Sequence, residues 1–198
     1  MNSGRAVGAW LSIALALGVV FLVPPASGAP APGPEVEVSV REGGKCRPFA
    51  EQLPALFTVG GMQAGERTPR VDVCVRNRGH MAARLTLAIF ERVESEAGCT
   101  GDEPSVDGTC GAGQAGDLGG NLVVIVTTQP DCRGPTATPI DVSLVALESV
   151  PAVLSPALRA NRTDCIGLQI EHRPMSDEAA SAAQTDTVSW RFAFDLAT

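Results

Sequence analysis

The segment close to the C-terminus constrains the fold of this chain more than any other feature. Its apolar and polar residues alternate over nine positions: Val188, Trp190, Phe192, Phe194 and Leu196 are separated by Ser189, Arg191, Ala193 and Asp195. Successive residues of a β-strand point to opposite faces, so this period of two places all the apolar side chains on one face. A large aromatic side chain buries on the order of 150–250 Å². We therefore expect Trp190, Phe192 and Phe194 to line the core of a β-protein.

Further segments carry strand signals of the same kind. Apolar and polar residues alternate at 35–41, 71–76, 85–90 and 166–170, and a continuous apolar run at 121–128 is typical of a central strand. Leu56–Val59 is a shorter apolar piece, and 141–150 fits either a strand or a short helix. The turn at 77–79 predicts that the strands on either side of it form an antiparallel pair.

This pattern predicts an all-β protein with seven or eight strands and at most short helices. The expected architecture is a two-sheet β-sandwich, jelly-roll-like, with a long Gly/Asp-rich loop at 94–120. Ser176 is expected to cap one or two helical turns. Gly65 and Asn161 are expected to adopt left-handed conformations in turns that lead into strands.

The N-terminal segment has the features of a secretory signal. Arg5 precedes an apolar run at 6–23, Pro24-Pro25 ends it, and Ala26-Ser27-Gly28 supplies the small residues of a cleavage site. We expect cleavage after Gly28 and hence a secreted protein, extracellular or at the cell surface.

The expected organisation is therefore a signal peptide at 1–28, a Pro-rich leader at 29–34 and a single β-sandwich domain at 35–198. The alternative is an uncleaved anchor, because the apolar run approaches the roughly 20 residues that span a bilayer. No later segment is long and apolar enough to cross a membrane, so we expect no membrane span after cleavage.

All the cysteines follow the signal: Cys46, Cys74, Cys99, Cys110, Cys132 and Cys165. An even number in an exported chain predicts disulfides. Cys99 and Cys110 bracket one Gly-rich loop, so we expect them to be bonded to each other, while the other four leave every pairing open. Metal binding is the alternative, but the chain has neither a CxxC pair nor a nearby histidine to complete a tetrahedral site.

No recognised motif points to catalysis. The sequence lacks both HExxH and GxSxG, and the two histidines, His80 and His172, are expected to be exposed residues at strand ends. The loop carries carboxylates that suit Ca²⁺, at Asp102, Glu103, Asp107 and Asp117. Their spacing matches no recognised calcium loop, so a solvated loop is the simpler interpretation. We expect a non-enzymatic protein with no catalytic, cofactor-binding or metal-ligating residues.

The net charge of the chain and the pattern of its first strand indicate which kinds of partner it can bind. A formal net charge of −7 offers nothing to a phosphate backbone, so we expect no nucleic-acid binding. Val36, Val38 and Val40 form a candidate donor strand, because a cleanly alternating strand can pair with a sheet edge of its own domain or of a neighbour. Pairing within its own domain is the default expectation, because most strands pair in this way, and self-association through this N-terminal strand is the alternative.

Several short motifs occur in a recognisable order. The strand at 36–40 is followed by the turn Met62-Gln-Ala-Gly-Glu66, by Asn77-Arg-Gly79 at a strand end, and by Gln184-Thr-Asp186 before the aromatic strand. The stretches Cys99-Thr-Gly and Thr109-Cys-Gly fit the same order. Together they resemble the TasA/camelysin family of secreted bacterial biofilm-matrix and cell-surface proteins, with Ala64 in place of the family's turn proline and Thr185 in place of a glycine.

The resemblance implies a jelly-roll domain with a structural role at the cell surface or in a biofilm matrix. It also implies subunits that assemble by donating an N-terminal strand to the next subunit. One alternative is a secreted binding module that presents the 94–120 loop. A second is a camelysin-like metallopeptidase, although no residues of this chain match such a site.

Overall fold

The computed structural model describes residues 35–46, 48–53, 57–96, 105, 116, 118–183 and 185–197. Contacts divide the chain into two units, Met1–Ala31 and Pro32–Thr198, and every described residue belongs to the second. The expected signal peptide and leader lie outside the described residues, as do Cys99, Cys110 and the four carboxylates of the predicted loop. No described helix is both long and apolar enough to cross a membrane.

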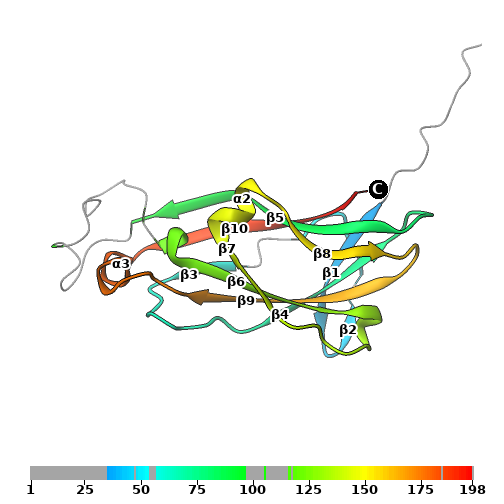
Figure 1. The fold of residues 1–198 in the computed structure, drawn as a ribbon, viewed down its shortest axis with the longest axis horizontal. Helices are drawn as coiled ribbons and strands as arrows, with labels where there is room; N and C mark the ends of the chain where they lie inside the picture. Colours follow the sequence, from blue (N-terminus) through cyan, green and yellow to red (C-terminus); the bar gives the residue numbers. More distant parts are fainter. Residues whose placement is uncertain are drawn as a thin grey trace, which may run out of the picture. The chain divides into compact units, whose positions relative to one another are not determined.

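Two antiparallel sheets face each other across the core (Figure 1). The six-stranded sheet has the order β2-β1-β4-β9-β6-β7, with β1 (Val36–Glu42), β2 (Lys45–Cys46), β4 (Val71–Asn77), β6 (Leu122–Gln129), β7 (Ile140–Ser143) and β9 (Thr163–His172). The four-stranded sheet has the order β3-β10-β5-β8, with β3 (Phe57–Gly60), β5 (Ala83–Ser95), β8 (Ala152–Leu158) and β10 (Thr187–Ala197). The helical pieces are η1 (Leu118–Asn121), η2 (Pro130–Cys132), α2 (Leu144–Ser149) and α3 (Asp177–Ala182). This architecture confirms the predicted all-β two-sheet sandwich.

The strand order is that of a jelly roll. When the eight strands from β3 to β10 are counted in chain order, the first, eighth, third and sixth form one sheet. The second, seventh, fourth and fifth form the other, which is the double Greek-key arrangement. The roll is therefore complete without β1 and β2, which extend the larger sheet beside β4.

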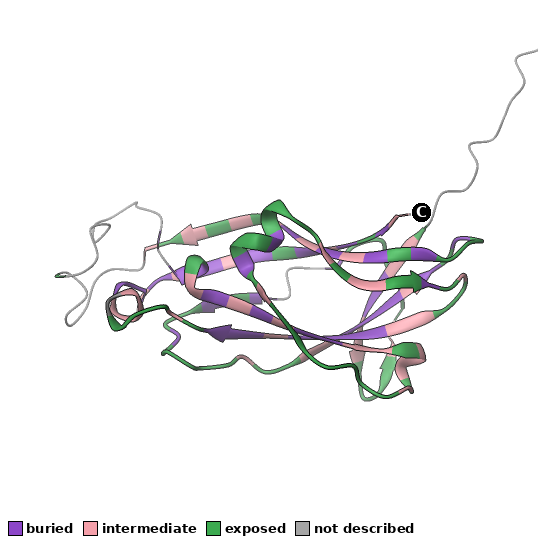
Figure 2. Cartoon of the chain, in the orientation of Figure 1, coloured by how far each residue is buried: buried purple, intermediate pink, exposed green. Residues whose placement is uncertain are grey.

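β10 supplies the centre of the core. It lies between β3 and β5, and buried and less buried residues alternate along it (Figure 2). Trp190 is 1% exposed; its ring stacks on Phe57 with 5.8 Å between centroids and meets Phe192 edge-on at 6.0 Å. Phe194 is also buried, so all three predicted aromatic residues lie in the core.

The predicted pairing of the strands around the 77–79 turn is wrong. β4 belongs to the six-stranded sheet and β5 to the four-stranded one. Asn77 is fully buried at this corner, where its Nδ2 donates to the carbonyl oxygens of Met81 (2.8 Å) and Leu158 (2.9 Å). These bonds hold the chain as it crosses between the sheets. The turn residues indicate a reversal of the chain, but they carry no information on which sheet receives the next strand.

Other local predictions agree more closely with the structure. The ambiguous segment at 141–150 contains both alternatives, because β7 runs directly into α2. Ser176 caps α3 by accepting a hydrogen bond from the Ala179 backbone N–H at 3.1 Å. Gly65 and Asn161 both have positive φ, 79° and 57°. β5 extends to Ser95, so ordered strand includes the first residues of the predicted 94–120 loop.

The sequence pattern missed β8. This strand contains Pro156, which removes a backbone donor and is normally excluded from strand interiors. β8 lies at the edge of the four-stranded sheet, where a missing N–H can face away from the neighbouring strand. The edge position therefore explains why the proline is tolerated.

Trp190→Ala is expected to lower the free energy of unfolding by about 3–5 kcal/mol, because it leaves a large cavity between the sheets. Urea unfolding followed by circular dichroism measures the change. Arg191→Ala, at the next and exposed position, is the matched control and should change stability by no more than about 0.5 kcal/mol. Equal stability of the two variants would contradict this account of the core.

Candidate functional site

The candidate donor strand lies at one side of the six-stranded sheet. β1 pairs antiparallel with β4 from Val36, opposite Asn77, to Val40, opposite Val73. Gly43 and Gly44, with φ of 58° and 79°, turn the chain from β1 into the two-residue β2. In the folded chain the candidate donor strand therefore completes the edge of its own sheet.

An ion-pair group fixes β1 against β4. Glu37 accepts hydrogen bonds from Arg76, with 2.9 Å to its Nε, and from Arg78, with 2.8 Å to its Nη1. The hydrogen bonds from Arg76 lower the pKa of the Glu37 carboxyl, and Arg78 acts in the same direction. The guanidinium of Arg76 also lies over the ring of Phe49, 4.1 Å from its centroid. Arg76 thus joins β1 to the segment that follows β2.

Away from β4, the C-terminal end of β1 pairs with β2, through Arg41 opposite Cys46 and Glu42 opposite Lys45. On the side away from β4, Val38 exchanges two backbone hydrogen bonds with Ala50, at 2.8 and 2.9 Å. On its inward side, Val38 borders a cavity of about 330 Å³ that is also lined by Leu53 and Phe194. The strand therefore has a continuous ladder on the β4 side and only short pairings on the other, while Val38 belongs to the core.

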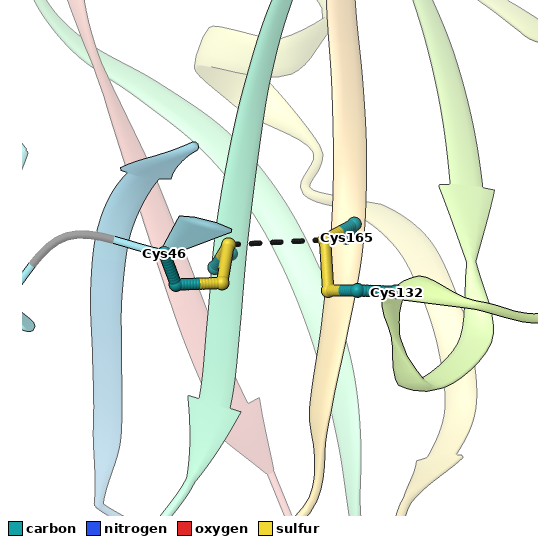
Figure 3. A group of neighbouring side chains, drawn as sticks. Cys46, Cys132 and Cys165 are labelled. Carbon is teal, nitrogen blue, oxygen red and sulfur yellow. Dashed lines mark hydrogen bonds between the residues drawn. A yellow bond between two sulfur atoms is a disulfide. The ribbon is translucent and has the colours of Figure 1, made fainter. Parts of the chain in front are cut away.

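Four cysteines meet on the outer face of the same sheet (Figure 3). Cys46 is bonded to Cys74, and Cys132 to Cys165, which decides between the pairings that the sequence left open. All four sulfur atoms lie within 4.8 Å of one another. Cys74 and Cys165 are opposite each other on β4 and β9, with 3.7 Å between their Sγ atoms. Neither disulfide sulfur carries a proton, so this is a van der Waals contact.

Alternation explains why the sulfurs lie on this face. Val73, Val75 and Ile166 point into the core, so the intervening Cys74 and Cys165 point to the opposite side of the sheet. The two bonds attach the β1–β2 hairpin to β4 and the η2 turn to β9. They therefore staple peripheral segments onto central strands.

A strained turn presents Cys132 to β9. Asp131 and Cys132 both have a φ of 53°, a left-handed conformation that costs of order 1–3 kcal/mol for a non-glycine residue. Asp131 is held by a 2.6 Å hydrogen bond from Arg162 Nε and by its own N–H, which donates to Asp164 at 2.9 Å. The bond from Arg162 lowers the pKa of Asp131, while burial raises that of Asp164. This polar group compensates for the strain in the turn.

Arg41 reaches across the outer face toward the cysteines. Its Nη1 donates to Gln129 Oε1 at 3.3 Å and its Nη2 to the Cys132 carbonyl oxygen at 3.4 Å. Its Nε is buried and has no acceptor among the described residues. A cation is thus placed beside the sulfur cluster, which the sequence gave no reason to expect because Arg41 and Cys132 are far apart in the chain.

The histidines do not come together. The register of β4 and β9 places His80 beyond one end of this pair and His172 at the other. His80 is exposed, as predicted, but the prediction that His172 is exposed is wrong: it is fully buried, and its Nδ1 lies 2.8 Å from the Met62 carbonyl oxygen. The cysteine cluster is the one group of possible metal ligands found among the described residues.

Comparisons with known proteins identify no relative. No family model matches the chain, and neither the curated proteins nor the solved structures contain a match.

Disulfide mapping of the folded protein should recover the pairs Cys46–Cys74 and Cys132–Cys165. Cys46→Ala/Cys74→Ala should lower the free energy of unfolding by roughly 3–4 kcal/mol, because the bond closes a loop of 28 residues in the unfolded chain. Cys132→Ala/Cys165→Ala removes a loop of similar length, 33 residues, and is the matched comparison. Recovery of a Cys74–Cys165 bond would contradict the assignment.

Acid should weaken the attachment of β1. Because the folded-state pKa of Glu37 is depressed, its contribution to stability is present above its ordinary value of 4.5 and is lost as the pH falls through the lower folded value. Glu37→Gln should therefore destabilise the protein at neutral pH and match the parent well below pH 4.5. Urea titrations at both pH values measure the difference. Glu35→Gln, an exposed neighbour, should show little effect at either pH; a pH-independent Glu37→Gln effect would refute the ion-pair account.

Proposed function

We propose that this protein is a secreted, non-enzymatic structural protein of the cell surface or extracellular matrix, whose copies associate by exchanging β1. One observation carries the proposal: β1 and β2 are added to a jelly roll that is already complete from β3 to β10. If β1 leaves, the edge of β4 becomes open. An open edge is a template for a strand from another copy.

Exchange between copies preserves the contacts that β1 makes within one chain. A β1 donated in trans forms the same register with β4 and the same ion pairs between Glu37, Arg76 and Arg78. The free-energy difference between the two arrangements is therefore small, and association depends on protein concentration. Donation from each copy to the next does not close on itself and builds a linear assembly.

The disulfide of the hairpin determines which residues can move. Because Cys46 is bonded to Cys74 of the same chain, β2 stays tethered to its own β4 by this bond, although its strand partner is β1, and only the segment before Cys46 is free to leave. Gly43 and Gly44 are the hinge, since glycine adopts both the turn and extended conformations without steric cost. A Cβ at either position would meet no atom within 4 Å, so the turn is open to solvent.

Three further features support the proposal. β1 has a full ladder on one side only: beyond its pairing with β4 it has two residue pairs with β2 and the bridge from Val38 to Ala50. The disulfides and the apolar N-terminal segment suit an oxidising compartment outside the cytoplasm. The order of short motifs that resembles TasA/camelysin proteins agrees with the same class of function.

Deleting residues 29–41 should abolish the oligomers of the mature protein, because the donated strand is then absent. Light scattering over a concentration series compares the mature and shortened chains. Equal association of the two chains, or strictly monomeric behaviour of both at high concentration, would exclude assembly through β1. The secreted binding module would then be the better interpretation.

A peptide of residues 35–42 provides the control. Added in excess to the mature protein, it should occupy open β4 edges and shorten the assemblies. The same peptide with Val36, Val38 and Val40 all replaced by Asp keeps the length but loses the apolar face, and should have no effect. If both peptides act alike, the effect does not depend on strand pairing.

A further inference from the structure

The geometry points to a second state of the cysteine cluster: after reduction, Cys46, Cys74, Cys132 and Cys165 bind one Zn²⁺ as a tetrathiolate site. The cluster is thus a redox switch. Two disulfides in the oxidised state, or one bound zinc ion in the reduced state, attach the β1–β2 hairpin and the η2 turn to the sheet. This inference does not depend on the proposed self-association, since it concerns the outer face of the sheet and not the exchange of β1.

The sulfurs lie close to the positions that a tetrahedral site requires. A Zn–S bond of about 2.3 Å places the sulfurs of a tetrahedral site roughly 3.8 Å apart. Cys74 and Cys165 already have 3.7 Å between their Sγ atoms, on neighbouring strands whose register holds them in place. All four sulfurs lie within 4.8 Å of one another, so after reduction only the two formerly bonded pairs have to move apart to surround one ion.

Two of the four cysteines are fixed on central strands, and the other two lie on peripheral segments that can shift. Cys74 and Cys165 are buried on central strands and provide two fixed ligands. Cys46 and Cys132 are half-buried and come from a two-residue strand beside Gly43-Gly44 and from the short η2 turn (Figure 3). Once the disulfides are cut, these two peripheral residues can separate from their partners by small movements of the hairpin and the turn.

The electrostatics favour thiolates at this position. Metal binding needs deprotonated cysteines, and a nearby cation stabilises the thiolate form. The guanidinium of Arg41 lies beside the cluster, with its Nη2 3.4 Å from the Cys132 carbonyl oxygen and a buried Nε that has no acceptor among the described residues. A zinc tetrathiolate carries a net charge of −2, which Arg41 would partly offset.

A dithiol reductant supplies the electrons and protons that reduction of the two disulfides requires. For each disulfide, the dithiol transfers two electrons and two protons, which cleaves the S–S bond into two thiols while the dithiol becomes a disulfide. Zn²⁺ then forms four Zn–S bonds and displaces the four thiol protons. Reoxidation by a disulfide or a peroxide removes four electrons, restores both S–S bonds and releases the ion.

The fold also explains why the sequence did not indicate this site. Zinc sites are usually recognised by pairs of ligands with short spacing. Here each ligand comes from a different element, so the ligand set exists only after β2, β4, η2 and β9 have assembled. The absence of a CxxC pair therefore carries no weight against metal binding by these four residues.

The test uses the full mature chain with Cys99→Ser/Cys110→Ser, which leaves only the four clustered cysteines. The protein is reduced with a phosphine, desalted without oxygen and titrated with Co²⁺ and then Zn²⁺. We expect one Co²⁺ per chain with the intense absorption of a tetrahedral cobalt tetrathiolate, its displacement by Zn²⁺, and no binding to the oxidised chain. Zn²⁺ should raise the thermal midpoint of the reduced chain but not of the oxidised chain.

Two variants in the same background complete the experiment. Cys74→Ser/Cys165→Ser should abolish the tetrathiolate spectrum, and Arg41→Gln should weaken the Co²⁺ affinity at least 10-fold while keeping the spectrum. If the reduced chain unfolds without metal, Zn²⁺ should restore its β-sheet circular dichroism. Absence of the tetrahedral spectrum, or a spectrum that survives Cys74→Ser/Cys165→Ser, would overturn the assignment.

Discussion

Trp190, Phe57 and Phe192 all contact one another in the core, and the closure of the sandwich depends on this aromatic group. The three rings come from β3 and β10, the first and last strands of the eight-stranded roll, which pair with each other. Burial of these rings joins the beginning and the end of the domain in one sheet. The opposing sheet is then held by the apolar faces of β4, β6 and β9.

The same alternation that builds the core also creates the sulfur cluster. On β4 and β9 the residues next to inward-pointing core residues point to the outer face, and two of these positions are cysteines in register. Peripheral segments supply their partners, so the covalent staples and the hydrophobic core lie on opposite faces of one sheet. The strained η2 turn is tolerated because Asp131 is held by Arg162 and Asp164 while Cys132 is bonded to Cys165.

The hairpin β1–β2 combines a covalent anchor with a strand held by non-covalent contacts. The bond to Cys74 anchors Cys46, whereas β1 is held by its ladder with β4, by the ion pair of Glu37 with Arg76 and by the buried side chain of Val38. With a covalent anchor at Cys46 and non-covalent contacts along β1, the strand can leave its own sheet without unfolding the domain. The proposed exchange and the proposed metal state share the Cys46–Cys74 pair and Arg41 of β1, but they are tested by different measurements, so each can fail without the other.

Much of the secondary structure followed from the sequence alone. Strict alternation at 188–196 identified the buried face of β10, and the capping residue Ser176 identified α3, because both signals depend on neighbouring residues. Tertiary structure alone decided that β4 and β5 lie in different sheets, that His172 is buried, and that four distant cysteines meet at one point. Alternation defines which side of a strand is buried but not which strand lies next to it. Neighbours are selected only when the two apolar faces pack together and the loops between them close.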